Sequence, residues 1–106
     1  METEIVVATS FMKRVLGLKG LSRDFKGQII LVPCHDIHTY TMTDQIDVAF
    51  IDEHGRVVAS YRNVPPKSRY KVRQACCVVE RYASQDDCWY ESGDQLFAYS
   101  FMVKEK

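Results

Sequence analysis

Residues 33–55 read PCHDIHTYTMTDQIDVAFIDEHG, and this stretch decides how the rest of the chain folds. Its apolar run 46–52 predicts a β-strand, because alternate residues of that run fall on two opposite faces. The EHG that follows fits a three-residue hairpin loop in which Gly55 supplies a positive φ angle. The next residues, RVVASY, would return as the second strand. We therefore expect 46–61 to form a rigid two-stranded platform, with segment 34–45 draped against it.

Further strands and one or two short helices are expected on either side of this platform. A helix over 11–18 is indicated by Ser10, a good capping residue, and Gly20 would end it. Its apolar stripe consists of Phe11, Val15 and Leu18. Ser84, followed by two aspartates, indicates a second short helix before Gly93. Apolar or β-branched runs predict strands at 2–9, 28–32, 75–81 and 95–103. The fold class that follows is mostly β (α+β), compact, with about six strands.

Length and charge narrow the class of protein. With 106 residues, the chain is expected to be a single domain over 1–106. Its 14 basic and 14 acidic residues balance, so we expect no nucleic-acid partner. No apolar run approaches the roughly 20 residues of a membrane span. Four cysteines permit disulfides, but METEIVVATS lacks the pattern of a secretory signal, so reduced thiols and a cytoplasmic location are expected.

The densest group of reactive side chains lies in segment 34–45. Cys34, His38 and Met42 repeat every four residues and would offer three soft-metal ligands on a helix or a folded-back loop. In an extended strand, however, His38 and Met42 would lie roughly 13 Å apart, too far for one ion. Cys34 and His38 also suit a thiol nucleophile and its base. Because no CxxC or HxxxH pair accompanies them, no metal or cofactor is predicted.

Asp47 is a carboxylate inside an apolar strand, where burial is costly unless the group is hydrogen-bonded or paired. The favoured interpretation is structural: Asp47 accepts hydrogen bonds and pins segment 39–45. The functional alternative makes it a polar anchor at the mouth of a ligand pocket.

Structural interpretations are also favoured elsewhere in the chain. Cys76 and Cys77 are adjacent in a predicted strand, so their side chains should point to opposite faces. The basic run 67–73 suits an edge strand with one charged face, which discourages edge-to-edge pairing. Trp89 and Tyr90 are expected to form a partly buried lid.

The block PCHDIHTYTMTDQIDVAFIDEHGRVV resembles the central block of family 192 of the domains of unknown function, a group of small bacterial and archaeal proteins. The resemblance extends through Arg14, Gly17 and Gly20 before the block, Val64-Pro65-Pro66 after it, and Gly93-Asp94-Gln95-Leu96 near the end. It implies a small β-rich, barrel-like fold. It implies no reaction and no catalytic residues. Thr43-Asp44-Gln45 departs from the family pattern, which has a proline just before the Ile-Asp pair.

Polar and aromatic side chains concentrated beside a rigid hairpin are typical of a binding site. The sequence therefore predicts a non-enzymatic binding module for a small ligand or a protein partner. Its surface would combine segment 34–45 with the loop at Pro65 and Pro66, and the predicted binding residues are His38, Thr39, Tyr40, Met42, Asp47 and Pro65. The alternative is a metal- or thiol-dependent protein that uses Cys34 and His38. A third interpretation is a purely structural component of an oligomer.

Overall fold

The computed structural model describes residues 4–84 and 87–96. Within these ranges the chain forms one α-helix, α1 (Phe11–Leu16), and one 3₁₀ helix, η1 (Gly17–Gly20). Its strands are β1 (Ile5–Ala8), β2 (Gln28–Leu31), β3 (Asp36–His38), β4 (Ile46–Ile51), β5 (Val57–Val64), β6 (Arg69–Lys71) and β7 (Cys77–Tyr82). No helix among the described residues is long and apolar enough to cross a membrane.

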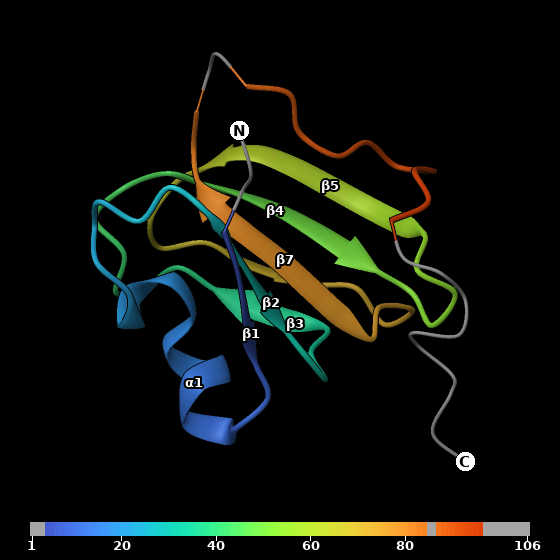
Figure 1. Ribbon diagram of the computed structural model, residues 1–106, viewed down its shortest axis with the longest axis horizontal. Helices are drawn as coiled ribbons and strands as arrows, with labels where there is room; N and C mark the ends of the chain where they lie inside the picture. The colour runs from blue at the N-terminus through green and yellow to red at the C-terminus, as the bar shows by residue number, and fades with distance from the viewer. Residues whose placement is uncertain (1–3, 85–86, 97–106) are drawn as a thin grey trace.

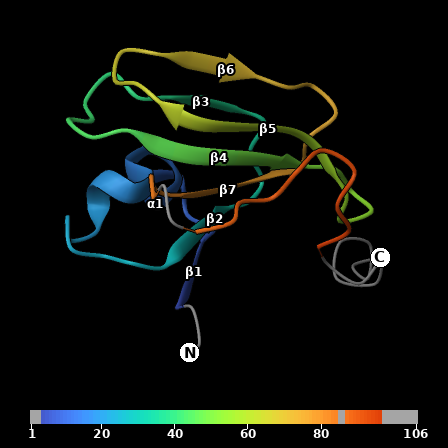
Figure 2. The same cartoon turned by 90° about the horizontal axis from the view of Figure 1, so that it is seen from above.

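Five strands form one sheet in the order β1-β2-β7-β4-β5, and β3 pairs with β6 in a separate two-stranded sheet. Only β1 and β2 run parallel; the other neighbours in both sheets are antiparallel. Figure 1 shows α1 at the β1 side of the large sheet. Figure 2 shows the β3–β6 pair on one side of the large sheet, where Tyr70 of β6 stacks on Tyr61 of β5 with ring centroids 4.5 Å apart. The mostly-β class is confirmed. The described strands close no barrel, since β1 and β5 stand at opposite edges of the sheet, so the barrel-like detail is not confirmed.

The predicted platform is confirmed and holds the core. All six residues of β4 are buried, because β4 lies between β5 and β7 with packed layers on both faces. On one face Val48 and Phe50 pack in a cluster that includes Leu18 and Leu31. On the other face, Ala49 and Ile51 pack against Ile30, Val79 and Trp89. Alternation along β4 therefore separates the interior into two apolar clusters.

The turn between β4 and β5 also agrees with the sequence. Gly55 has a φ of 80°, as the three-residue loop requires. The Asp52 carboxylate accepts hydrogen bonds from the backbone N–H groups of His54 (2.9 Å) and Arg56 (3.0 Å), which satisfies donors that the ladder leaves open. The hairpin end is thus fixed by one aspartate and one glycine.

The helical segment differs from its prediction. Ser10 caps α1 as expected, its hydroxyl accepting from the Lys13 N–H at 3.2 Å. However, α1 ends at Leu16, because Gly17 takes a φ of 52° and turns the chain into η1; the predicted stop at Gly20 is the end of η1 instead. As a consequence the expected apolar stripe is broken, and Phe11 stays 70% exposed while Leu18 is buried.

Two expectations near the C-terminus have different outcomes. The helix predicted after Ser84 is wrong for the residues that the structure describes, since 87–96 contain turns and one bridge between Gln95 and Arg56. Most of the strand predicted at 95–103 lies outside the described residues.

All four cysteines are free, and the adjacent pair diverges as expected, with Cys77 buried and Cys76 half-buried.

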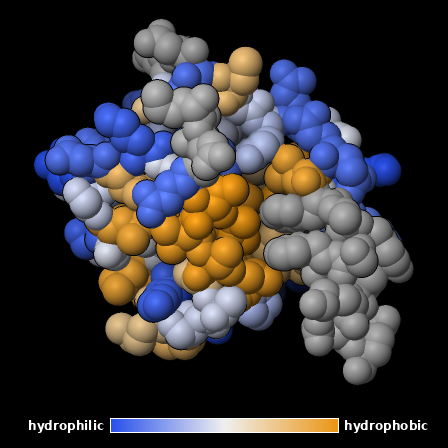
Figure 3. Space-filling view, viewed as in Figure 1, coloured by the Kyte–Doolittle hydropathy of each residue, from blue (hydrophilic) through white to orange (hydrophobic). Residues whose placement is uncertain are grey.

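An apolar patch lies on the face seen in Figure 3, over β1 and β2. Ile5 and Val7 of β1 contribute to it and are about half exposed.

The basic run predicted as an edge strand contains β6, which pairs with β3 alone, and its Arg69 and Lys71 point to solvent. Lysine and arginine on so short a strand protect its open edge from further pairing.

Candidate functional site

Segment 34–42 consists of β3 followed by a turn in which the Met42 N–H donates to the Thr39 carbonyl, and Thr39 joins this segment to the loop at Pro65. The Thr39 side chain is 1% exposed, and its hydroxyl donates to the Pro65 carbonyl at 2.8 Å and accepts from the Ser68 N–H at 2.9 Å. Backbone bonds between Thr39 and Lys67 and between Thr39 and Ser68 complete the junction. The two loops predicted to form one surface therefore lie side by side, held by a buried threonine.

A cavity of about 180 Å³ lies between the helical segment 11–18 and segment 34–42. The inner strands β2, β4 and β7 each contribute a side chain to its wall. We call it the Glu80 cavity, and it is defined by Leu18, Leu31, Cys34, His38, Met42 and Glu80. Cys34, His38 and Met42, which the sequence spaces four residues apart, thus meet at one cavity.

Glu80 of β7 is the charged group most deeply placed in this cavity. It is 5% exposed and faces the same side of the sheet as Val78, toward the larger apolar cluster. Burial raises the pKa of Glu80 to about 7, and the backbone N–H of Leu18 opposes that rise by donating to the carboxylate. Among the described residues, no ion pair joins Glu80 to a basic side chain. The carboxyl group therefore sits at a cavity wall without a charged partner.

Gly17 makes room for this carboxyl group. A Cβ atom at position 17 would lie 3.0 Å from the Glu80 Oε1 atom, and the φ of 52° is one that side chains rarely adopt. The same turn buries Leu18, whose carbonyl accepts from the Tyr82 hydroxyl at 3.3 Å. The glycine that ends α1 thus also sets how closely η1 approaches Glu80.

Arg14 and Cys34 complete the polar side of the cavity. One Arg14 guanidinium nitrogen donates to the Pro33 carbonyl at 3.0 Å, whereas its buried Nε has no hydrogen-bond partner. The Cys34 thiol donates to the Asp36 carbonyl at 3.5 Å. Burial is the main cause that raises the Cys34 pKa, so the thiol stays protonated at neutral pH. A protonated thiol is a poor nucleophile, which gives the thiol alternative no support.

The structure brings together only part of the predicted binding set. His38 and Met42 line the cavity, and Tyr40 stacks on His38 outside it with ring centroids 4.9 Å apart. Thr39 and Pro65 form the loop junction described above instead of facing the cavity. No group of three His, Cys, Asp or Glu residues within 4–84 and 87–96 is arranged to hold a metal ion.

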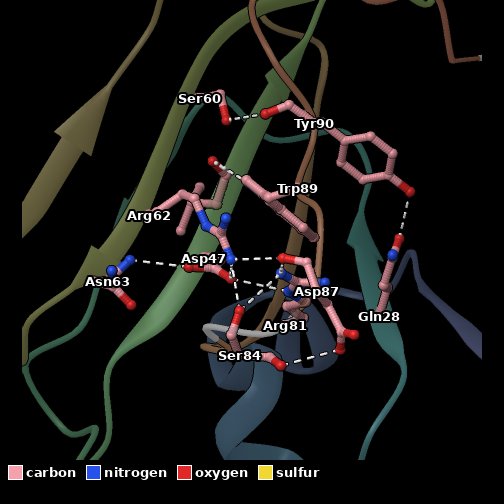
Figure 4. A network of polar contacts seen from close by, with 11 residues as sticks. Gln28, Asp47, Ser60, Arg62, Asn63, Arg81, Ser84, Asp87, Trp89 and Tyr90 are labelled. Carbon is pink, nitrogen blue, oxygen red and sulfur yellow. Dashed lines mark hydrogen bonds and ion pairs between the residues drawn. The ribbon is translucent and has the colours of Figure 1, made fainter.

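Asp47 lies on the opposite face of the sheet, away from the Glu80 cavity. It is fully buried and accepts hydrogen bonds from the Arg81 Nε and from the backbone N–H of Asn63, both at 2.9 Å (Figure 4). Asn63 has a φ of 56°, and the β4–β5 register shifts just beside it. The Asp47 carboxylate is therefore satisfied by Asn63 and Arg81, and segment 39–45, which the sequence analysis expected it to pin, is not among these partners.

The network around Asp47 extends to the segment that covers this face. The Arg81 guanidinium lies 4.6 Å from the Trp89 ring centroid, and it donates to the carbonyls of Ser84 and Asp87 (Figure 4). Trp89 is 8% exposed and donates through its indole N–H to the Val48 carbonyl, which fits the predicted lid. A hollow of about 600 Å³ lies beside Arg81 and Asp87, but their polar groups are already joined to one another.

Sequence reasoning missed Glu80, although a signal was present. Glu80 interrupts the apolar run ACCVVE in the same way that Asp47 interrupts its own strand. A carboxylate within an apolar strand needs a hydrogen bond or a charged partner, and this holds for Glu80 as it does for Asp47. The sequence alone does not show which of the two carboxylates, Asp47 or Glu80, pairs with a basic side chain.

Comparison with known proteins supports the fold. A solved structure of a protein of unknown function from Novosphingobium aromaticivorans matches with a TM-score of 0.63 at 16% identity, over 76% of this chain and 64% of that chain. Identity at that level supports a shared fold alone. No curated protein gives a significant match. The family model DUF192, described as an uncharacterized ACR, matches residues 1–89. Since that match covers most of the chain, the protein belongs to family 192 of the domains of unknown function.

Proposed function

We propose that this chain is a non-enzymatic binding domain for a small ligand and that its site is the Glu80 cavity. The observation that carries the proposal is the Glu80 carboxyl group, buried at a cavity wall with no basic side chain paired to it among the described residues. Polar groups buried at such a wall fix the orientation of a ligand, while apolar neighbours supply contact area.

The walls of the cavity have the composition of a ligand site. Leu18, Leu31 and Ile46 are almost fully buried and give it an apolar floor, while Arg14 and His38 add polar atoms. The volume of about 180 Å³ suits a molecule of fragment size, since an engineered apolar cavity of roughly 150 Å³ accepts benzene.

A fragment screen on isotope-labelled protein tests the proposal. We expect hits whose binding shifts the backbone amide resonances of Leu18, Cys34 and Met42 in two-dimensional NMR spectra. His38→Ala should weaken those hits, because His38 lines the cavity. His35→Ala is the matched control: His35 is exposed, three positions away and outside the cavity lining. Hits that respond equally to both substitutions, or that map to other surfaces, would contradict the proposed site.

A further inference from the structure

The charges that line the Glu80 cavity are not equivalent. Asp36 is paired with Arg69, whose guanidinium contacts it at 2.6 Å, and this hydrogen bond is the main cause that lowers the Asp36 pKa. The Arg14 guanidinium is directed to the Pro33 carbonyl, and its Nε is shielded from solvent. Among the described residues of the cavity, Glu80 is thus the acid without a cation.

We infer that the ligand of this site is a small organic amine, whose ammonium group pairs with the Glu80 carboxylate and whose apolar body lies against Leu18, Leu31 and Ile46. This inference rests on the proposed function and names the chemical class of its ligand. An ammonium group supplies the positive charge that the buried carboxylate lacks and adds hydrogen-bond donors to the one that Leu18 provides, and such charge-assisted bonds are short and strong.

The surroundings of the carboxylate favour an amine with an apolar body over a hydrated inorganic cation. No group of three His, Cys, Asp or Glu side chains in the described parts of the chain offers a metal its ligands, whereas an ammonium needs one carboxylate and a few acceptors. Toward solvent the cavity is bordered by Phe11, Val15 and Leu16, which are 70%, 52% and 44% exposed. An apolar ligand that extends outward would cover these side chains and remove them from water.

Arg14 provides the competing prediction. If its unpartnered Nε were the main recognition element, the ligand would be an anion such as a carboxylate. The two cases differ in the sign of the ligand charge, and a set of probes with one common body separates them. Benzylamine, benzyl alcohol and benzoate share a phenyl ring that is close in size to the cavity and differ mainly in the polar group.

The experiment titrates each probe into wild-type protein and into Glu80→Gln at about pH 8, above the Glu80 pKa of about 7, and follows the amide resonances of Leu18, Cys34 and Met42. We expect benzylamine to bind wild type at least about tenfold more tightly than benzyl alcohol, because a charged hydrogen bond is involved. In Glu80→Gln this preference should vanish, while weak binding of benzyl alcohol persists. That persistence shows that the cavity is still formed in the variant.

Each other outcome overturns the inference in a recognisable way. Benzoate binding that exceeds benzylamine binding would assign the site to Arg14 and to anions. Equal binding of amine and alcohol would show that Glu80 contributes no charge recognition. In both cases probes still shift the cavity resonances. Ligand binding at the Glu80 cavity would then stand, while the assignment of the ligand as an amine would fail. If none of the three probes shifts them, the amine inference fails, and the fragment screen with His38→Ala decides separately whether the cavity binds any ligand.

Discussion

Glu80→Gln should make the protein more stable above neutral pH and change its stability little in acid. The carboxyl group has a pKa of about 7 in the folded protein, against 4.5 for an exposed glutamate, because burial disfavours the charged form. Between these two values the native state binds more protons than the unfolded chain. The contribution of Glu80 to stability is therefore fully present below about pH 4.5 and is lost as pH rises through about 7.

The size of the effect follows from the pKa shift. Each pKa unit corresponds to about 1.4 kcal/mol, so the full loss amounts to roughly 3 kcal/mol in the free energy of unfolding. Most of it falls between about pH 5 and about pH 8. Glutamine has nearly the same shape as glutamate and carries no titrating group. The difference between variant and wild type should therefore grow by most of that loss over this interval, while all other titrations cancel.

Urea unfolding of both proteins at the two pH values measures this difference. Glu91→Gln is the control, because Glu91 is exposed and its carboxylate is already solvated in the folded state. If Glu80→Gln and Glu91→Gln show the same stability change at both pH values, Glu80 does not titrate as a buried acid. Glu80 would then be solvated in the folded protein and would not be the buried acid of the cavity.

Three further predictions concern the framework of the site. Gly17→Ala should destabilise the fold by about 1–3 kcal/mol, since the φ of 52° is strained for alanine and its Cβ would crowd Glu80; an unchanged unfolding midpoint would contradict this. Thr39→Val should cost about 1–3 kcal/mol in chemical unfolding by leaving the Ser68 N–H without an acceptor side chain, whereas the exposed Thr41→Val should cost little. Asp47→Asn should cost about 3–5 kcal/mol by leaving Arg81 buried without its partner, and the double variant with Arg81→Met should lose less than the sum of the two single losses; strict additivity would refute the pairing.

Local sequence determined much of the fold. The alternation in 46–52, the EHG turn and the Ser10 cap each act over a few residues, so their consequences follow from backbone geometry and from which residues are apolar. Local sequence does not determine where the helix ends. Gly17 and Gly20 are both able to end a helix, and only packing of Leu18 into the core selects the earlier one.

The site depended on contacts between distant segments. Asp47 and Glu80 are alike in sequence, each a carboxylate within an apolar strand, and the sequence pointed to Asp47. In the folded chain Asp47 meets Arg81, which lies 34 positions away, on one face of the sheet, while Glu80 faces the other side and meets a cavity. Sequence periodicity determines that two acids are buried. Only the order of strands in the sheet decides which of them is neutralised by an arginine and which lines a cavity without a basic partner, because that pairing is set by neighbours in space.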